Sequence, residues 1–218
     1  MTQQSAEGGV PPEVVRAVVE HYEAQLRRHG PTARGMDWRD EASQQLRFRV
    51  LCGVGDLRGR SVHEVGAGAG HLLDHLREGG IAADYSGSDL SAAMVEAARR
   101  RHPGARFEQR DLLRESPAPS YDVVLCSGLF HVCAGHGGPA FAGFVEAMLR
   151  RMWALAREAL AFNLMSDQVD YRVPSLHYTS PAATLDFCRR ELSRHVALRH
   201  DYPLHEYTVY VYRNPRDA

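Results

Sequence analysis

The chain has 218 residues, of which 44% are hydrophobic, so it can bury one sizeable core and requires no second domain. Its formal net charge is −1, which excludes a strong overall field that would recruit nucleic acid or a membrane surface. The 26 basic residues are all arginine, so a mechanism that needs a catalytic lysine is also excluded.

The cysteines and the apolar segments indicate the compartment. The four cysteines are scattered and form no C-x-x-C pair, which favours reduced residues over a disulfide or zinc framework. The first residues are polar and lack the apolar core of a signal peptide, and no apolar run is long enough to span a bilayer. We therefore expect a cytoplasmic protein that binds neither nucleic acid nor a membrane, and we expect no metal site.

Two helices are predicted before the first strand. Apolar residues recur with helical spacing over 13–28, and a second helix is predicted over 41–52. The loop between them contains Trp38, a large aromatic residue that either covers a site or anchors the loop to the core. We expect residues 1–54 to form a helical extension of one compact unit over 55–218.

From residue 61 onward, strand patterns alternate with helix patterns, which implies a parallel sheet with right-handed crossovers. The strand patterns cover 61–65, 83–88, 105–109, 121–126 and 159–164. The helix patterns cover 70–79, 92–101, 139–157 and 181–193. Two further β patterns, 195–202 and 206–212, close the chain, and the second alternates as a terminal antiparallel strand does. Residues 166–180 are predicted to form a loop.

The first strand pattern runs into a glycine-rich turn with the sequence Val62-His63-Glu64-Val65-Gly66-Ala67-Gly68-Ala69-Gly70. A backbone without Cβ atoms can approach a ligand closely, and the amides that begin the next helix are unpaired donors. A flexible turn is the simpler alternative, but the acid Glu64 lies two positions before three alternating glycines. A dinucleotide-binding turn would need its third glycine at position 71, where this chain has His71, so a nicotinamide cofactor is disfavoured.

The pattern acid-x-Gly-x-Gly-x-Gly resembles the first motif of the class I S-adenosylmethionine-dependent methyltransferases, and Gly87-Ser88-Asp89-Leu90-Ser91-x-x-Met94 resembles their second motif. The resemblance covers roughly residues 55–213. It implies an α/β fold with a Rossmann-like, seven-stranded, mostly parallel sheet in the order 3-2-1-4-5-7-6, flanked by helices. It also implies that the N-terminal helices form a lid over cofactor and substrate, and that the cofactor is S-adenosyl-L-methionine.

The resemblance assigns cofactor contacts to residues at the strand ends. It implies that Glu64 supports the cofactor ammonium, that Asp89 accepts hydrogen bonds from the ribose hydroxyls, and that Asp111 accepts one from the adenine amino group. Arg47 would meet the cofactor carboxylate, or else belong to a solvated helix face. The other implied cofactor contacts are Gly66, Ala67, Gly68, Gly70, Leu90, Met94, Leu112 and Ser127. The ordinary alternatives are a helix cap for Asp89, a turn for Asp111 and core packing for the apolar residues.

Methyl transfer is an in-line displacement that often requires a base to remove a proton from the acceptor. His131 follows the fourth strand pattern and titrates in a suitable range, so we predict it as the base, with a packing role as the alternative. The predicted substrate contacts are Tyr22, Trp38, Tyr171 and His177.

A compact core with a small N-terminal lid suits an enclosed small substrate. We therefore predict methyl transfer to an oxygen or nitrogen atom of a small molecule, by a monomer or homodimer. Neither a Pro-Pro-Tyr nor a Pro-Cys sequence follows the fourth strand pattern, which disfavours DNA-base methylation. Methylation of a macromolecule and cofactor binding without catalysis, as in a regulatory module, are the alternatives.

Overall fold

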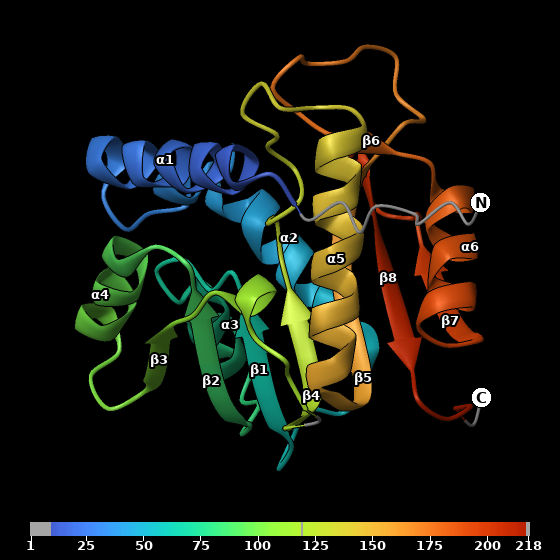
Figure 1. Ribbon diagram of the computed structural model, residues 1–218. Coiled ribbons are helices and arrows are strands. Elements are labelled where there is room, and N and C mark those ends of the chain that lie inside the picture. Colours follow the sequence, from blue (N-terminus) through green and yellow to red (C-terminus); the bar gives the residue numbers. More distant parts are fainter. Residues whose placement is uncertain (1–9, 119, 217–218) are drawn as a thin grey trace.

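The computed structural model describes residues 10–118 and 120–216. The chain forms three layers, in which helices cover both faces of one mixed sheet (Figure 1). Within the described ranges, no helix combines the length and the apolar character needed to cross a membrane.

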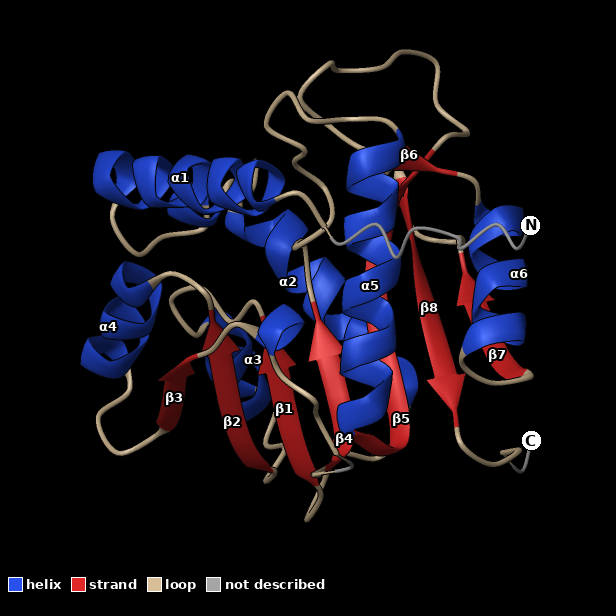
Figure 2. Ribbon diagram, viewed as in Figure 1, coloured by secondary structure: helices blue, strands red, loops and turns tan. Residues whose placement is uncertain are grey.

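Helices and strands alternate along most of the chain (Figure 2). The α-helices are α1 (Pro12–His29), α2 (Glu41–Leu51), α3 (His71–Glu78), α4 (Ala92–Arg101), α5 (Pro139–Leu155) and α6 (Pro181–Glu191). The strands are β1 (Ser61–Val65), β2 (Asp84–Asp89), β3 (Arg106–Gln109), β4 (Tyr121–Cys126), β5 (Ala156–Ser166), β6 (Tyr178–Thr179), β7 (His195–Arg199) and β8 (Glu206–Tyr212). Three short 3-10 helices are η1 (Arg34–Met36), η2 (Cys52–Val54) and η3 (Leu112–Arg114).

The main sheet has the strand order β3-β2-β1-β4-β5-β8-β7, and β6 pairs with β5 off this path. The strands β1 to β5 are mutually parallel, whereas β8 is antiparallel to both β5 and β7. Because β7 and β8 are the sixth and seventh strands that we predicted, the expected order 3-2-1-4-5-7-6 is confirmed.

The junction between α5 and β5 differs from the prediction. The helix ends at Leu155 and the strand begins at once at Ala156, whereas we predicted a helix to residue 157 and a strand from residue 159. Because the strand starts early, its first residue pairs with Tyr121, and the register between β4 and β5 shifts directly after this pair. The helical pattern of α5 continues past its end in the sequence, so the boundary is set by sheet pairing.

Two further boundaries in the second half of the chain are corrected. The predicted loop 166–180 contains the strand β6, whose Thr179 Oγ1 donates to the carbonyl of Met165 at 3.1 Å. A strand of two residues is too short to show periodicity in the sequence, so only this pairing reveals it. The edge strand β7 ends at Arg199, whereas we predicted a strand to residue 202.

The sheet is buried on both faces, which explains the nearly continuous apolar sequence of β4. Val124 and Cys126 belong to the core that includes residues of α1, α5 and α6. Val123 and Leu125 belong to the core that includes residues of α2, α3 and α4. Successive residues of a strand point to opposite faces, so β4 contributes to both cores in turn.

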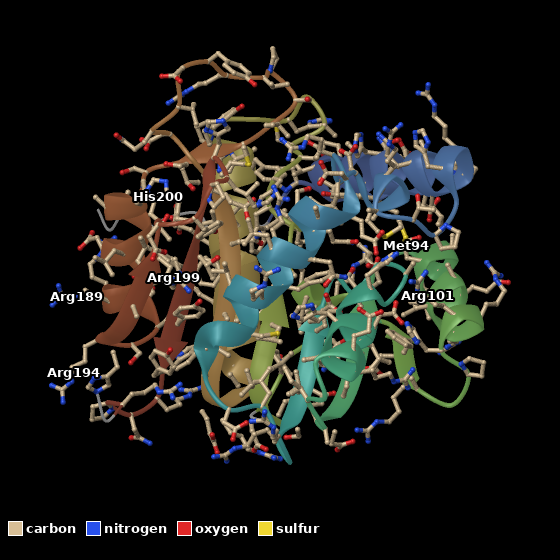
Figure 3. The ribbon with its side chains drawn as sticks, turned by 180° about the vertical axis from the view of Figure 1, so that it is seen from behind. Met94, Arg101, Arg189, Arg194, Arg199 and His200 are labelled. Carbon is tan, nitrogen blue, oxygen red and sulfur yellow. The ribbon has the colours of Figure 1, made fainter. Side chains whose placement is uncertain are left out.

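The two N-terminal helices occupy different layers. The first, α1, lies across the carboxyl ends of the parallel strands (Figure 1). The second, α2, packs on the sheet face that Figure 3 shows, with Phe48 and Leu51 in the core. Of the expected lid, α1 and the loop after it therefore lie over the strand ends, while α2 belongs to the core packing. The division of the chain into an extension over 1–54 and a unit over 55–218 stays a prediction. Residues 1–9 of the extension lie outside the described ranges.

Candidate active site

A cavity with about 1070 Å³ of empty space, part of it open to solvent, lies at the carboxyl ends of β1, β2 and β4, beneath α1. Open parallel sheets bind their ligands at this edge. Twelve of the predicted site residues line the cavity: Tyr22, Trp38, Glu64, Gly66, Ala67, Gly68, Asp89, Leu90, Met94, Asp111, Leu112 and Ser127. The structure thus brings together, around one cavity, residues that lie between positions 22 and 127 of the sequence.

The turn after β1 holds its glycines in conformations that other residues rarely adopt. The φ angles of Gly66, Gly68 and Gly70 are +74°, +52° and +81°. The Gly66 amide donates to the carbonyl of Ser88 at 2.9 Å, which ties the turn to the end of β2. The turn therefore exposes bare backbone to the cavity, as close approach of a ligand requires.

A methionine of the N-terminal segment lies on this turn. The sulfur of Met36, in η1, is 3.4 Å from the Ala69 amide nitrogen, and a Cβ at Gly68 would lie 2.7 Å from it. The glycine-rich turn thus accommodates a thioether chain directly against its backbone.

Asp89 links the end of β2 to the glycine-rich turn. Its Oδ2 accepts from the Gly68 amide and its Oδ1 from the Ser91 amide, both at 2.9 Å. Burial raises the pKa of Asp89, and these backbone donors oppose the shift. The cap of α4 is Ser91, whose Oγ accepts from the Met94 amide at 3.2 Å, so the helix-cap alternative for Asp89 is wrong.

Glu64 is buried in β1, with 3% of its surface exposed. Burial raises the pKa of Glu64 to about 8; the nearby Asp89 adds to the shift and a hydrogen bond from the Tyr85 hydroxyl opposes it. With these neighbours alone, Glu64 is mostly protonated at pH 7.

The adenine side of the predicted site lies at η3 and α4. Asp111 Oδ1 accepts from the Leu113 amide at 3.2 Å and caps η3, so Asp111 does form a turn, but it also lines the cavity. Leu112 and Met94 are buried and line the cavity as well. Met94, labelled in Figure 3, lies at the end of α4 that faces α1.

Ser127 follows β4 directly, and its Oγ is buried without a hydrogen-bond partner among the described residues. The next residue, Gly128, is held on both sides: its amide donates to Asn163 Oδ1 at 2.8 Å, and its carbonyl accepts from the Tyr22 hydroxyl at 3.1 Å. Burial raises the pKa of Tyr22, so this hydroxyl stays protonated and neutral. The Ser127 hydroxyl is thus a polar group that a ligand can satisfy.

Arg47 is not among the residues that line the cavity. Its Nε pairs with Glu206 Oε2 at 2.8 Å, its Nη1 donates to the Ser43 carbonyl at 3.0 Å, and its guanidinium lies 4.3 Å from the ring centroid of Trp38. The solvated-face alternative is wrong, because only 11% of the side chain is exposed. Contact with a cofactor carboxylate stays a prediction.

His131 is also buried and lies behind the cavity wall. Its Nε2 is 3.7 Å from Glu206 Oε2 and has no hydrogen-bond partner in the described chain. Burial lowers the pKa of His131 to about 3, and the positive charge of Arg47 adds to the shift. The ring contacts Trp38 edge-on, with centroids 5.6 Å apart, so His131 is one side chain away from the cavity.

Three other predicted residues lie outside the cavity lining. Gly70 is the N-terminal cap residue of α3, and a Cβ there would lie 2.9 Å from both His102 and Phe107. Tyr171 is 70% exposed in the loop after β5. His177 lies near the end of that loop, and its amide donates to the carbonyl of His131 at 2.8 Å. Their predicted roles stay predictions.

Much of the cavity wall was not predicted. Residues that we did not assign to the site include Val15, Val18, Val19, Met36, Gln44, Phe48, Arg110, Leu129, Phe144 and Met148. Most of them are apolar residues of helices. Their spacing in the sequence predicts a helix, but it does not show which of these residues face a cavity and which face the core.

Known proteins match both the sequence and the fold. The family model of a methyltransferase domain matches residues 63–159. A protein of Mycobacterium tuberculosis, named as a methyltransferase without a stated substrate, is 34% identical over 153 residues, which are 69% of this chain and 92% of that protein. A trans-aconitate 2-methyltransferase of Rhodopseudomonas palustris is 30% identical over 109 residues, 46% of this chain and 42% of that enzyme.

Two solved structures show the same fold. The 1,6-didemethyltoxoflavin-N1-methyltransferase of Burkholderia thailandensis superimposes with a TM-score of 0.66 at 17% identity, over 95% of this chain and 92% of that one. The magnesium protoporphyrin IX methyltransferase of Synechocystis, with S-adenosylmethionine bound, gives a TM-score of 0.56 at 16% identity, over 96% of this chain and 87% of that one. Together with the sequence matches, these findings show that the chain belongs to the class I S-adenosylmethionine-dependent methyltransferases, enzymes whose cofactor is S-adenosylmethionine.

Proposed function

We propose that the enzyme transfers the methyl group of S-adenosylmethionine to an oxygen or nitrogen atom of a small molecule held in the cavity beneath α1. The observation that carries this proposal is that α1 and the Trp38 loop line the same cavity as the cofactor residues, so that an acceptor would lie in a pocket and not on an open surface. The named substrates of trans-aconitate 2-methyltransferase and of the toxoflavin enzyme, both small molecules, support it.

The residues around the cavity fit the cofactor. Gly66 and Gly68 leave bare backbone on the cavity wall, which suits close approach of a methionine portion once the Met36 side chain has moved off Gly68 and Ala69. We assign Glu64 to the ammonium group, Asp89 to the ribose hydroxyls and Asp111 to the adenine, each an acidic side chain on the cavity wall. When bound, the cofactor supplies a methyl group on a positively charged sulfur, which an acceptor can displace in line.

Proton removal from the acceptor remains our proposed role for His131. The lowered pKa of about 3 leaves the imidazole neutral at pH 7 with a free nitrogen, but it also makes His131 a weak base, so this role requires that the bound acceptor raise the pKa. The contact between the His131 and Trp38 rings makes Trp38 the side chain that controls access of an acceptor to this base.

The first prediction tests the cofactor and the acceptor together. S-adenosylmethionine and S-adenosylhomocysteine should raise the melting temperature, whereas NAD should have no effect. At a thousandfold excess over Kd, either ligand should raise the free energy of unfolding by about 4 kcal/mol. Incubation with a mixture of small phenols, amines and carboxylic acids should then release S-adenosylhomocysteine. Turnover only with protein or nucleic-acid fractions would contradict the small-molecule proposal.

The second prediction concerns the protonation of Glu64. Its pKa is raised to about 8, and a cofactor ammonium beside it would lower that pKa, so binding at pH 7 should release close to one proton. The affinity for S-adenosylhomocysteine should therefore rise with pH up to about 8 and then level off. Calorimetry at pH 7 in two buffers of different ionisation enthalpy measures the released protons. Glu64→Gln should release none, and equal release by the variant and the wild type would refute the ammonium assignment.

A further inference from the structure

The part of the cavity wall that we do not assign to the cofactor is largely apolar. It is formed by α1, α5 and the residues after β4, and its apolar members are Val15, Val18, Val19, Leu129, Phe144 and Met148. Val18, Phe144 and Met148 are each less than 8% exposed, so they present a packed surface and not mobile chain ends. Val15, Val19 and Leu129 are half-buried and supply most of the apolar area that a ligand can remove from water.

The wall offers no free positive charge among the residues that the structure describes. Arg110 lines the cavity, but its Nε donates to Glu115 at 2.6 Å and its Nη1 lies 3.5 Å from a carboxylate oxygen of Glu108. His71 is the other basic residue on the wall; burial, with a contribution from Arg101, lowers the pKa of His71 to about 4, so it is neutral at pH 7.

The same wall carries acidic groups. Glu64, Asp89 and Asp111 all line the cavity. Glu64 is mostly neutral at pH 7, but an acceptor carboxylate would still lose its hydration shell and meet Asp89 and Asp111 without a free cation on the part of the wall that the structure describes. Burial of an unpaired charge is strongly unfavourable, so this composition disfavours a ligand with a net negative charge, whereas the carboxylate of the cofactor is balanced by its own ammonium.

The acceptor part of the wall also carries polar side chains, Gln44 among them, and the Ser127 hydroxyl is a buried one that is available to an acceptor. The Ser127 Oγ is buried and has no partner in the described chain, whereas the nearby Tyr22 hydroxyl already donates to the Gly128 carbonyl. A hydroxyl can both donate and accept, so Ser127 suits a single neutral hydroxyl or ring nitrogen.

We propose that the methyl acceptor is an uncharged, mostly apolar molecule that presents one hydrogen-bonding group to Ser127, and that carboxylated acceptors are excluded. The inference rests on the proposed function and narrows it to one substrate class. It also separates this enzyme from the relatives named for trans-aconitate, whose substrate is a carboxylate.

The test compares ligands that are matched in size and differ in charge. The protein is first saturated with S-adenosylhomocysteine, and a rise in melting temperature verifies loading. Binding of 2-naphthol, 2-naphthoate and trans-aconitate is then measured at pH 7 by calorimetry and saturation-transfer NMR. We expect 2-naphthol to bind at least ten times more tightly than 2-naphthoate, and trans-aconitate not to bind.

A second comparison isolates Ser127. In the wild type, 2-naphthol should bind more tightly than naphthalene, and Ser127→Ala should reduce this preference by about fivefold, the value of one neutral hydrogen bond. A packing defect would weaken both ligands alike and leave their ratio unchanged.

The outcomes are distinct. Binding of either carboxylate as tight as that of 2-naphthol, or no binding of 2-naphthol to the loaded protein, overturns the acceptor class. An unchanged preference in Ser127→Ala overturns the role of Ser127. Failure of S-adenosylhomocysteine to raise the melting temperature at the first step contradicts the proposed function itself.

Discussion

Asp89→Ala should raise the Kd for S-adenosylhomocysteine at least ~100-fold and remove most of the thermal stabilisation that this ligand gives. The carboxylate accepts from the amides of Gly68 and Ser91, so its loss leaves two donors unpaired and loosens the glycine-rich turn. In the proposed complex, the ribose hydroxyls also lose their charged acceptor. Hydrogen bonds to charged groups contribute about 1.5–3 kcal/mol each, so the loss of two accounts for ~100-fold in affinity. Calorimetry measures the change.

The same strand supplies a matched control. Asp84 begins β2, is exposed and pairs at 2.5 Å with Arg106, so Asp84→Ala removes a carboxylate from the other end of the strand. It should leave the Kd within about twofold of the wild type, because exposed pairs contribute about 0–1 kcal/mol and this one lies far from the turn. Normal binding by Asp89→Ala would move the ribose contact to another residue. An equal loss in both variants would indicate damage to β2 itself.

That the residues we propose for the cofactor line one cavity could be predicted, because their signals are local in the sequence. The turn after β1 combines an acid with alternating glycines over a few residues, and Asp89 and Asp111 each follow a strand pattern. Once the strands are parallel, their carboxyl ends share one edge, so these residues must come together. The bounds of β1 and β4 agree with the prediction because each strand is a short β-type run between polar turns.

The acceptor side could not be predicted in the same way. Val15 and Val18 repeat with helical spacing, but spacing does not tell which side of α1 faces a cavity and which faces α5. The sequence also does not show that the Ser127 hydroxyl lacks a hydrogen-bond partner among the described residues, because this depends on which polar groups the fold places near it. Arg47 is the clearest case, because its partner Glu206 is 159 residues away in the sequence and no local pattern relates them.

Arg47 and Glu206 begin a buried chain of hydrogen bonds that ends at α1. Glu206 Oε1 accepts from Asn163 Nδ2 at 3.1 Å, and Asn163 Oδ1 accepts from the Gly128 amide at 2.8 Å. The Gly128 carbonyl in turn accepts from the Tyr22 hydroxyl. The chain therefore ties α2, β8, β5 and α1 to the segment that carries Ser127, and the ion pair supports the cavity wall.

Arg47→Ala should lower the free energy of unfolding by about 3–5 kcal/mol, because it leaves the fully buried carboxylate of Glu206 without its countercharge. Burial already raises the pKa of Glu206, and Arg47 opposes the shift, so the variant should raise it further. A carboxyl group with a raised folded-state pKa contributes stability at low pH and loses it as pH rises through that pKa. The loss in the free energy of unfolding of Arg47→Ala, relative to the wild type, should therefore be smaller at pH 5.5 than at pH 8. Urea unfolding at both values measures it.

Two further variants make this prediction specific to the buried charge. The double variant Arg47→Met with Glu206→Gln removes both charges and keeps an acceptor for Asn163, so it should recover to within about 1–2 kcal/mol of the wild type. Arg16→Ala breaks an exposed pair with Glu20, whose side chains are 74% and 69% exposed, and should cost at most about 0.5 kcal/mol. If the double variant is as unstable as Arg47→Ala, the loss comes from the contacts of the guanidinium with the Trp38 ring and the Ser43 carbonyl and not from an unpaired carboxylate.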